Sequence, residues 1–269
     1  ILDGSFNFSC FRIANGSFAE VNGAMTLNGG TITRMSLSDS NMGAITVDGG
    51  SFTMGNGELS SISASSANCG AVYVNGGKFA MNGGKITGCT FKNQYSGAVA
   101  LADGTMTMTD GTISGNTASD YNAAGGVLVN GTSSLAMSGG MIGKEDKTDE
   151  SHVYNDATEA AVLTISGAAK IYTNVANNSR LNADGGEIFG EVKNAVASRY
   201  AVITGTEEAA GSTEFSGAVI NNEAGTIAGG VFTGSVTNNL GAIFGGDFSR
   251  ATLRGKLAIT FDPDNGEEP

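Results

Sequence analysis

The sequence predicts an all-β fold, a single-chain right-handed parallel β-helix with three short strands in each coil. Three observations support this fold class: a 27-residue repeat, apolar residues at alternating positions within it, and glycine pairs between the alternating segments. Alternation with a period of two, interrupted by turns, is typical of short strands rather than helices. The composition agrees, because 42 glycines and two prolines suit many tight turns inside a continuous hydrogen-bond ladder.

The repeat is clearest over residues 70–96, where Val72 and Val74 alternate in a first segment and Phe79 and Met81 in a second. Similar residues recur 27 positions away on both sides, so the register is constant over four units. Three apolar columns follow this step: Met25, Phe52, Phe79 and Met106; Leu27, Met54, Met81 and Met108; Ile32, Leu59, Ile86 and Ile113. These columns predict the residues of the core.

A 27-residue unit cannot bury the inner face of its short strands alone, so we expect copies to stack with each strand parallel to its counterpart in the next coil. The known preference of parallel crossovers favours a right-handed wind. Residues between the core positions then point outward. The outward columns are Thr26, Thr53, Ala80 and Thr107, and Thr46, Tyr73 and Ala100, which contain no acid or base.

Four segments follow from the spacing of the repeat. Residues 1–143 form a β-helical section with 27-residue coils, and residues 144–159 form a charged loop or junction. Residues 160–256 continue the β-helix with shorter coils, because related strings there recur after 16 or 17 positions. Residues 257–269 leave the repeat and are expected to be a linker or the start of a following module.

Two strings resemble the repeats of polymorphic outer-membrane proteins and autotransporter passengers, in which an apolar residue and an asparagine precede a Gly-Gly-Ala-Ile-like step. The matching positions are Phe91, Asn93 and Gly97-Ala98-Val99, and Ile113, Asn116 and Gly125-Gly126-Val127. The resemblance covers about two coils well and the first 143 residues loosely. More generally, the chain resembles pectin-lyase-like right-handed β-helices, a family that implies shape but includes lyases, hydrolases, adhesins and inert stalks.

The last residues resemble the opening of the small bacterial surface modules of the Listeria-Bacteroides repeat type. In those modules a first strand leads into an aspartate-proline-asparagine-glycine turn. The residues that match are Phe261, Asp262, Pro263, Asn265 and Gly266, with Asp264 as an extra residue in the turn. The resemblance implies that another module follows.

The formal net charge of −12 disfavours binding to nucleic acid or to an anionic membrane surface, because the field of the protein would repel both. No apolar run is long enough to span a membrane. The chain opens in the middle of the pattern at Ile1, so we expect it to be a segment of a longer secreted protein. We therefore expect an extracellular location, at the cell surface or in the cell wall.

The three cysteines, Cys10, Cys69 and Cys89, leave at least one without an intrachain partner. Cys89 aligns with Met35 and Ile62 when the coils are stacked. It is therefore predicted to fill space in the core rather than to act as a reactive thiol.

Carboxylates at catalytic spacing are not evident in the sequence. Asp103 and Asp110 flank one predicted strand and would lie about 23 Å apart if the strand is extended, whereas paired glycosidase carboxyls lie about 5 to 9.5 Å apart. Glu58 and Lys85 occupy one column in successive coils and are predicted to form a solvated ion pair, with acid–base catalysis as the alternative. We predict no catalytic residues and no cofactor.

The only histidine, His152, lies in the charged segment near four other possible metal ligands, Asp146, Asp149, Tyr154 and Asp156. A solvated charge cluster is the preferred interpretation and a metal site is the alternative. We predict no resident metal.

The one candidate binding site is built around Tyr95 and Tyr121, which fall at nearly equivalent points of successive coils. Two rings one coil apart, with amide and charged groups beside them, could form a platform for a sugar ring, the alternative being ordinary turn packing. The full set is Lys92, Asn93, Tyr95, Asp120, Tyr121 and Asn122. A glycan or a protein of a host or microbial surface is the partner that this site would take.

The sequence therefore favours a non-enzymatic extracellular repeat module of a bacterial cell-surface protein, a stalk or an adhesin. The alternative is a carbohydrate-active enzyme of the pectin-lyase-like fold, a polysaccharide lyase or a glycoside hydrolase. Its groove would be built from loops such as the segment Lys144 to Glu159.

Overall fold

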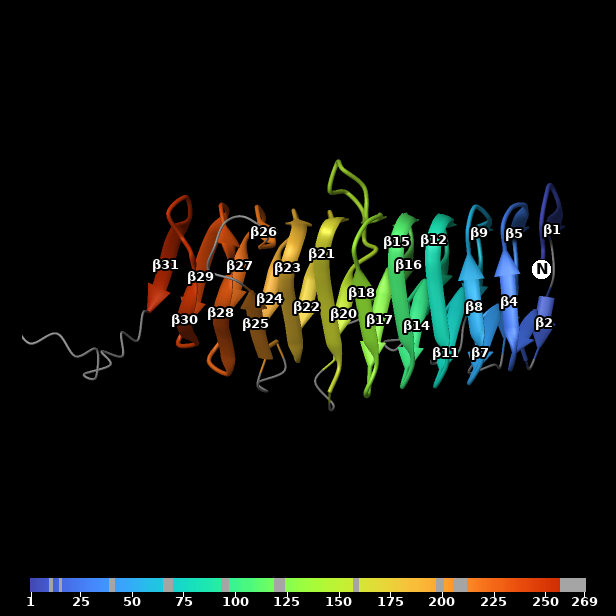
Figure 1. Cartoon of the computed structure of the whole chain (residues 1–269), viewed down its shortest axis with the longest axis horizontal. Helices are drawn as coiled ribbons and strands as arrows, with labels where there is room; N and C mark the ends of the chain where they lie inside the picture. The colour runs from blue at the N-terminus through green and yellow to red at the C-terminus, as the bar shows by residue number, and fades with distance from the viewer. Residues whose placement is uncertain are drawn as a thin grey trace, which may run out of the picture.

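The computed structural model shows an all-β parallel β-helix, an elongated stack of coils with the first and last strands at opposite ends (Figure 1). No helix long and apolar enough to cross a membrane occurs among the described residues. The residues that the structure describes are 1–9, 12–14, 16–38, 42–64, 70–92, 97–118, 124–156, 160–196, 201–205 and 212–256.

Three parallel sheets form the walls of the stack. Sheet C, with 11 strands, consists of β3 (Ala19–Val21), β7 (Ile45–Asp48), β11 (Val72–Asn75), β14 (Val99–Ala102), β17 (Val127–Asn130), β20 (Val153–Asn155), β22 (Val175–Asn177), β24 (Val192–Asn194), β27 (Val219–Asn221), β29 (Ser235–Asn239) and β31 (Thr252–Lys256). Sheet B, with 5 strands, consists of β2 (Arg12–Ala14), β6 (Ser36–Ser38), β10 (Ser63–Ala64), β13 (Thr90–Phe91) and β16 (Thr117–Ala118).

Sheet A, with 15 strands, is the longest because some coils contribute two strands to it on either side of a bend. Its members are β1 (Asn7–Ser9), β4 (Ala24–Leu27), β5 (Thr31–Thr33), β8 (Ser51–Met54), β9 (Glu58–Ser60), β12 (Lys78–Thr87), β15 (Thr105–Ser114), β18 (Ser134–Met137), β19 (Met141–Ile142), β21 (Val162–Ile171), β23 (Arg180–Ile188), β25 (Ala201–Gly205), β26 (Glu214–Phe215), β28 (Gly225–Phe232) and β30 (Ala242–Asp247). At the bend Gly84 has a φ of +80°, and a Cβ there would strike the carbonyl of Gly57 in the preceding coil.

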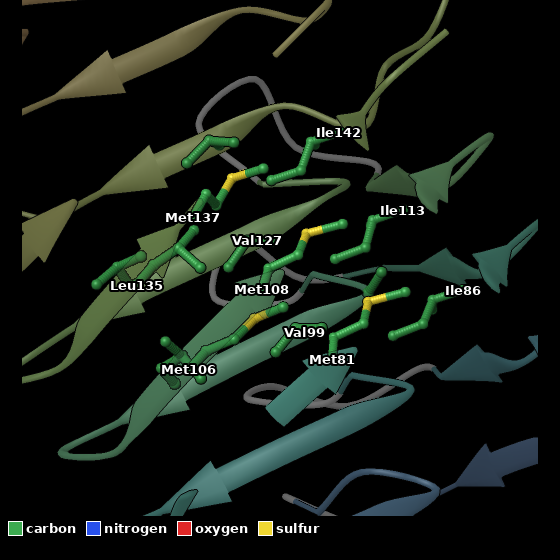
Figure 2. Packing of buried hydrophobic residues seen from close by; sticks show 14 of the residues in the cluster. Met81, Ile86, Val99, Met106, Met108, Ile113, Val127, Leu135, Met137 and Ile142 are labelled. Carbon is green, nitrogen blue, oxygen red and sulfur yellow. The ribbon is translucent and has the colours of Figure 1, made fainter. Parts of the chain in front are cut away.

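The predicted 27-residue register is confirmed. Phe79 pairs with Phe52 on one side and with Met106 on the other, and Met81 pairs with Met54 and Met108. The column of Ile32, Leu59, Ile86 and Ile113 is likewise formed by direct register partners. Figure 2 shows how like side chains lie over one another, with Met81, Met108 and Met137 in one row and Ile86, Ile113 and Ile142 in the next. Side chains that repeat in sequence therefore share one dry interior.

The prediction of three strands in every coil is not confirmed. Residues 45–64 contribute four strands and residues 72–91 contribute three, because the two segments of sheet A are separate in the first coil and joined in the second. Sheet B ends at β16, and from β20 onward the chain passes from sheet A to sheet C by a short turn. The cross-section is therefore narrower in the second half.

The narrowing also shortens the coils. Val175 pairs with Val192, and Val219 pairs with Val236, each 17 positions further along the chain. Where residues 195–218 separate two strands of sheet C, the step from Val192 to Val219 is 27. In both halves each strand therefore pairs in parallel with its counterpart in the next coil, but the number of residues in a coil differs.

The core is continuous from Val21 to Val236 and is reinforced by stacked rings. Phe52 lies on Phe79 with ring centroids 5.1 Å apart and planes 8° apart, and Phe215 lies on Phe232 at 4.8 Å. Cys89 is fully buried and free, as predicted for a space-filling residue, and burial raises the pKa of its thiol to about 12. A thiol held in its neutral form is a poor nucleophile. Cys10 and Cys69 lie outside the described residues.

Candidate functional site

Most of the predicted binding site falls outside the part of the chain that the structure describes. This applies to Asn93, Tyr95, Asp120, Tyr121 and Asn122. Lys92 is described: its side chain is exposed, and its backbone N–H donates to the carbonyl of Ala64 at 3.2 Å. The sugar-platform prediction therefore stays a prediction.

The ends of β13 and β16, from which the two predicted contact segments begin, lie one coil apart. Phe91 at the end of β13 pairs with Ala118 at the end of β16. Phe91 is buried, and the hydroxyls of Thr90 and Thr117 are 3.4 Å apart on the outer side. The two predicted contact segments therefore leave sheet B from adjacent, fixed positions.

The outward column on sheet C is not the plain solvated face that the sequence suggested. Thr46 is only 3% exposed and Ala100 only 2%. Ala100 belongs to a second apolar cluster, with Ala124 and Leu128, on the outside of the sheet. Tyr73 and Tyr154, the register neighbours of Ala100 and Leu128, pack against its two ends. The outer side of sheet C therefore holds a small buried apolar cluster between two tyrosine side chains.

The chain leading into β3, β7 and β17 covers part of this outer side. The N–H of Gly43 donates to the hydroxyl of Thr46 at 3.1 Å, and that hydroxyl is 2.6 Å from the hydroxyl of Ser17. A Cβ on Gly43 would lie 2.7 Å from the backbone nitrogen of Tyr73. Alternation alone cannot reveal such a cover, since it assigns residues to two faces but does not say what lies on the second.

The charged segment forms a junction where sheet B ends. In Figure 1 its part before β20, residues 144–152, is the loop that projects from the rod near β18 and β21. Asp149 accepts hydrogen bonds from the N–H of Gly115 at 2.6 Å and of Ser151 at 2.9 Å, and the hydroxyl of Ser151 accepts from the N–H of Asn116. Asp149 is 6% exposed and Ser151 is fully buried. These side chains therefore satisfy backbone donors just before β16, and Asp149 is not a solvated charge.

His152 and its neighbours are the residues that the sequence offered as alternative metal ligands. Among the described residues no group of three or more His, Cys, Asp or Glu is arranged to hold an ion. The Nδ1 of His152 is buried without a hydrogen-bond partner. The pKa of His152 is lowered, mainly by desolvation and also by the positive charge of Lys193. The negative charges of Glu150 and Asp149 oppose this shift. The lowered pKa and the unpartnered Nδ1 both favour the neutral imidazole in the fold.

Next to this junction an aromatic pair spans two coils. Tyr172 and Phe189 stack with centroids 4.4 Å apart, and the ammonium of Lys147 lies 5.6 Å from the centre of the Phe189 ring. The Tyr172 hydroxyl donates to Glu145 at 3.2 Å, and both desolvation and this carboxylate raise the pKa of the phenol. The charged segment is thus anchored to the narrow half by packing and a hydrogen bond.

The sequence predicts correctly that Glu58 and Lys85 are neighbours in one column, but the predicted ion pair between them is wrong. The two residues are register partners, yet their charged groups do not form an ion pair. Ion pairs formed by described residues are those of Lys193 with Glu191 at 3.2 Å and of Arg250 with Glu214 at 3.7 Å. Both pairs involve partly exposed side chains, so each stabilises the fold only weakly.

Several carboxylates are stabilised in the ionised form by hydrogen bonds from their own turn or from a turn of the next coil. The N–H and hydroxyl of Thr132 bind Asp103 and lower its pKa, and Thr148 does the same for Asp146. The hydroxyl of Ser249 lowers the pKa of Asp247. A general acid in glycoside cleavage needs a raised pKa, so these environments act in the opposite direction.

The main feature missed by the sequence analysis is a ladder of five buried asparagines in sheet C. Each side-chain amide donates to the amide oxygen of the next coil, at 2.7 Å for the first pair and 2.8 Å for the other three. The last amide donates to the carbonyl of Gly241 at 2.8 Å. The members of the ladder are Asn155, Asn177, Asn194, Asn221 and Asn238.

The same amides also satisfy the turns of the narrow coils. Asn155 donates to the carbonyl of Arg180 at 2.9 Å, and Asn221 donates to that of Ala242 at 3.2 Å. At the start of the ladder the Oδ1 of Asn155 is buried without a partner. The signal in the sequence is a Val-x-Asn string in these strands, as in Val192-Lys193-Asn194. Because side chains alternate between the two faces of a strand, an asparagine two positions after an inward valine also points inward.

Comparisons with protein-family models, with curated proteins and with solved structures found no match for the chain. The class of the protein therefore rests on its own geometry. It is an all-β solenoid of the parallel β-helix type.

Proposed function

We propose that the chain is a non-enzymatic extracellular repeat module of a bacterial cell-surface protein, acting as a stalk or an adhesin. The observation that supports this most is the unbroken parallel register of sheet C from β3 to β31, which holds the two ends of the rod apart. Every coil gives its backbone hydrogen bonds to its neighbours, so length is built from one repeated contact. Such a rod suits the display of a binding surface away from its point of attachment.

As an adhesin, the rod would bind its partner along one side. The partner proposed is a glycan or a protein of a host or microbial surface. The paired strand ends at Phe91 and Ala118 support this side, because the two predicted contact segments leave sheet B from neighbouring coils and can present tyrosine rings and amides together to a sugar ring. The contact set is the one predicted from the sequence, with Lys92 as its described member.

We also propose kinship with the pectin-lyase-like β-helices that carry polymorphic-outer-membrane-protein or autotransporter repeats. The support is the resemblance around Phe91 and Ile113 together with the parallel coils that both positions join. This kinship fits a surface location.

The test has two arms on the purified chain. In the first, the chain is screened against an array of glycans and surface proteins, and we expect binding that falls about tenfold or more in Tyr95→Ala and Lys92→Ala. The matched control is Lys78→Ala, an exposed lysine on sheet A, which should bind as the parent does. Binding unaffected by both contact variants would contradict the proposed surface.

In the second arm, the chain is incubated with a panel of polysaccharides, and released ends and unsaturated products are measured. We expect no release above a heat-denatured control. Release of oligosaccharides would overturn the non-enzymatic function and establish the alternative, a carbohydrate-active enzyme.

A further inference from the structure

Asparagine followed by glycine occurs at several turns of the solenoid. In such a pair the backbone nitrogen of the glycine can attack the side-chain carbonyl carbon of the asparagine, because glycine has no side chain to hinder the approach. Asparagine is accordingly one of the thermolabile residues of proteins. The described pairs begin at Asn22, Asn28, Asn56, Asn75, Asn82 and Asn130. The surroundings of each pair decide whether it can react in the folded chain.

In the earlier coils, the turn from sheet C to sheet A binds its glycine nitrogen into the ladder. The N–H of Gly49 donates to the carbonyl of Asn75 at 2.9 Å, and the N–H of Gly76 donates to that of Ala102 at 3.0 Å. Asn75 is also held through its side chain, whose Nδ2 donates to Asp48 at 2.9 Å. An N–H that is bound to a carbonyl of the next coil points away from its own side chain, so attack requires local opening of the ladder.

The ladder does not hold Gly131 in the same way. In the described part of the chain, β17 pairs with β20 only as far as Val129 with Asn155, where the solenoid changes from wide to narrow coils. The N–H of Gly131 donates instead to the Oδ1 of the adjoining Asn130 at 2.7 Å. The amide carbon bonded to this oxygen therefore lies beside the nitrogen that would attack it, and groups held in contact react faster than groups held apart.

The turn at Asn130 also admits water and needs no rearrangement of the backbone. Asn130 and Gly131 are half-buried, and the adjoining Thr132 is exposed. Gly131 has a φ of +66°, which glycine adopts without strain. Among the described Asn-Gly pairs, the pair at Asn130 is the one in which the glycine N–H donates to the asparagine side chain. Gly111 makes the same contact with Asp110 at 2.7 Å, but a carboxylate is a poor electrophile and releases no ammonia.

We propose that Asn130 is a site of spontaneous modification and the first asparagine of the folded chain to deamidate. The Gly131 nitrogen loses its proton to water and forms a bond to the Cγ of Asn130. The Cγ–Nδ2 bond breaks, and the amide nitrogen takes a proton from water and leaves as ammonia. The succinimide then adds a water molecule at either carbonyl, which gives aspartate or isoaspartate. Water is the co-reactant, and the inference does not depend on the proposed surface function.

Either product disturbs the turn between β17 and β18. The new carboxylate lies near Asp103, whose Oδ1 accepts from the N–H and hydroxyl of Thr132 and is the atom that a Cβ on Gly131 would strike. Isoaspartate also adds a methylene group to the main chain. The carbonyl of Asn130 accepts from the N–H of Ser133 at 3.2 Å, and the Ser133 side chain is fully buried. The modification therefore loosens the last wide coils, next to the junction with the narrow ones.

The experiment is incubation of the full chain at neutral pH and physiological temperature, followed by peptide mapping with mass spectrometry. Deamidation at each asparagine is followed over time in the folded chain and, in parallel, in urea, where the local sequence alone sets the rate. In the fold we expect Asn130 to react about tenfold or more faster than Asn75, and in urea we expect the two to react at similar rates.

Two variants complete the test. Asn130→Gln has a longer side chain that disfavours ring closure, so it should remove the main acidic species seen on ion exchange. Asn75→Gln is the matched control and should leave that species in place. The acidic species separated from the parent chain should melt at a lower temperature than the unmodified chain.

Three results would overturn the proposal. The first is an Asn75, or another asparagine, that reacts as fast as Asn130 in the fold. The second is an Asn130 that stays intact in the fold while it reacts in urea. The third is a modified species that melts as the parent does, because the turn would then be indifferent to the change.

Discussion

One interior column of sheet C divides the molecule into two halves of different chemistry. Through the wide coils it is aliphatic, and through the narrow coils it is amide, although the strands, the direction and the inward orientation are the same. The aliphatic members are Val21, Val47, Val74, Leu101 and Val129, and the amide members are Asn155, Asn177, Asn194, Asn221 and Asn238.

Stacking in sheet C requires neighbours of one kind rather than of one polarity. An aliphatic residue packs on an aliphatic residue, and a buried amide is stable where the next coil supplies its partner. The chain changes from one solution to the other once, between Val129 and Asn155, and the unpaired Oδ1 of Asn155 marks that boundary. The ladder belongs to the narrow coils because its amides also bind the carbonyls of their turns.

The largest effect is expected from a charge in the aliphatic half. Met81→Asp would place an unpaired carboxylate between Met54 and Met108, where all three side chains are fully buried. We expect the free energy of unfolding to fall by more than about 4 kcal/mol and the middle coils to unfold. Thermal and urea denaturation check this, and a variant that melts as the parent does would contradict the inward assignment.

The next largest loss of stability is expected from a break in the asparagine ladder. Asn194→Leu removes the acceptor of Asn177 and the donor of Asn221, so we expect a loss of about 2 to 4 kcal/mol in urea denaturation. The control is Asn182→Leu, an asparagine that bonds Thr164 and Thr204 on the outside of sheet A. Equal losses in the two variants would show that the buried ladder has no special role.

An amide can also be moved into the aliphatic half, where no amide partner is present. Val74→Asn should cost about 1 to 3 kcal/mol, because the buried amide meets only Val47 and Leu101. Adding Val47→Asn supplies a stacked partner, so the double variant should lose less than the sum of the single losses by about 0.5 to 1.5 kcal/mol. Simple additivity in a double-mutant cycle would contradict the pairing rule.

The smallest expected effect is at the junction between the halves. Desolvation lowers the pKa of His152 in the fold, so the unfolded chain binds the proton more readily. The stability from the neutral imidazole is present above the unfolded pKa of about 6.5 and is lost as the pH falls toward the folded value. His152→Gln should therefore weaken the fall in melting temperature between neutral and mildly acidic pH. An unchanged pH profile would contradict this role.

Much of the fold could be predicted from the sequence. The step from Phe52 to Phe79 to Met106 is visible as a repeat, and a repeat that cannot bury itself alone has to stack. The merging of two strands into β12 and β15 could not be predicted, because it depends on how the glycine bend is hydrogen-bonded in space.

The candidate site was less predictable, for three physical reasons. Alternation does not say what covers an outer face, so the burial of Thr46 and Ala100 was missed. Charge suggested solvent, but Asp149 is buried because it binds backbone donors before the end of sheet B. The asparagines were visible in Val-x-Asn strings, but polarity suggests an outward side chain unless the partner in the next coil is known.

The most direct test of the two-half account is hydrogen exchange of the asparagine side-chain amides, measured by NMR on the labelled chain. The account predicts that the Nδ2 hydrogens of Asn177, Asn194 and Asn221 exchange far more slowly than those of the exposed Asn22, because they are held in a dry ladder. Exchange at the rate of Asn22 would contradict it, since the narrow coils would then have solvated amides where the account places a core.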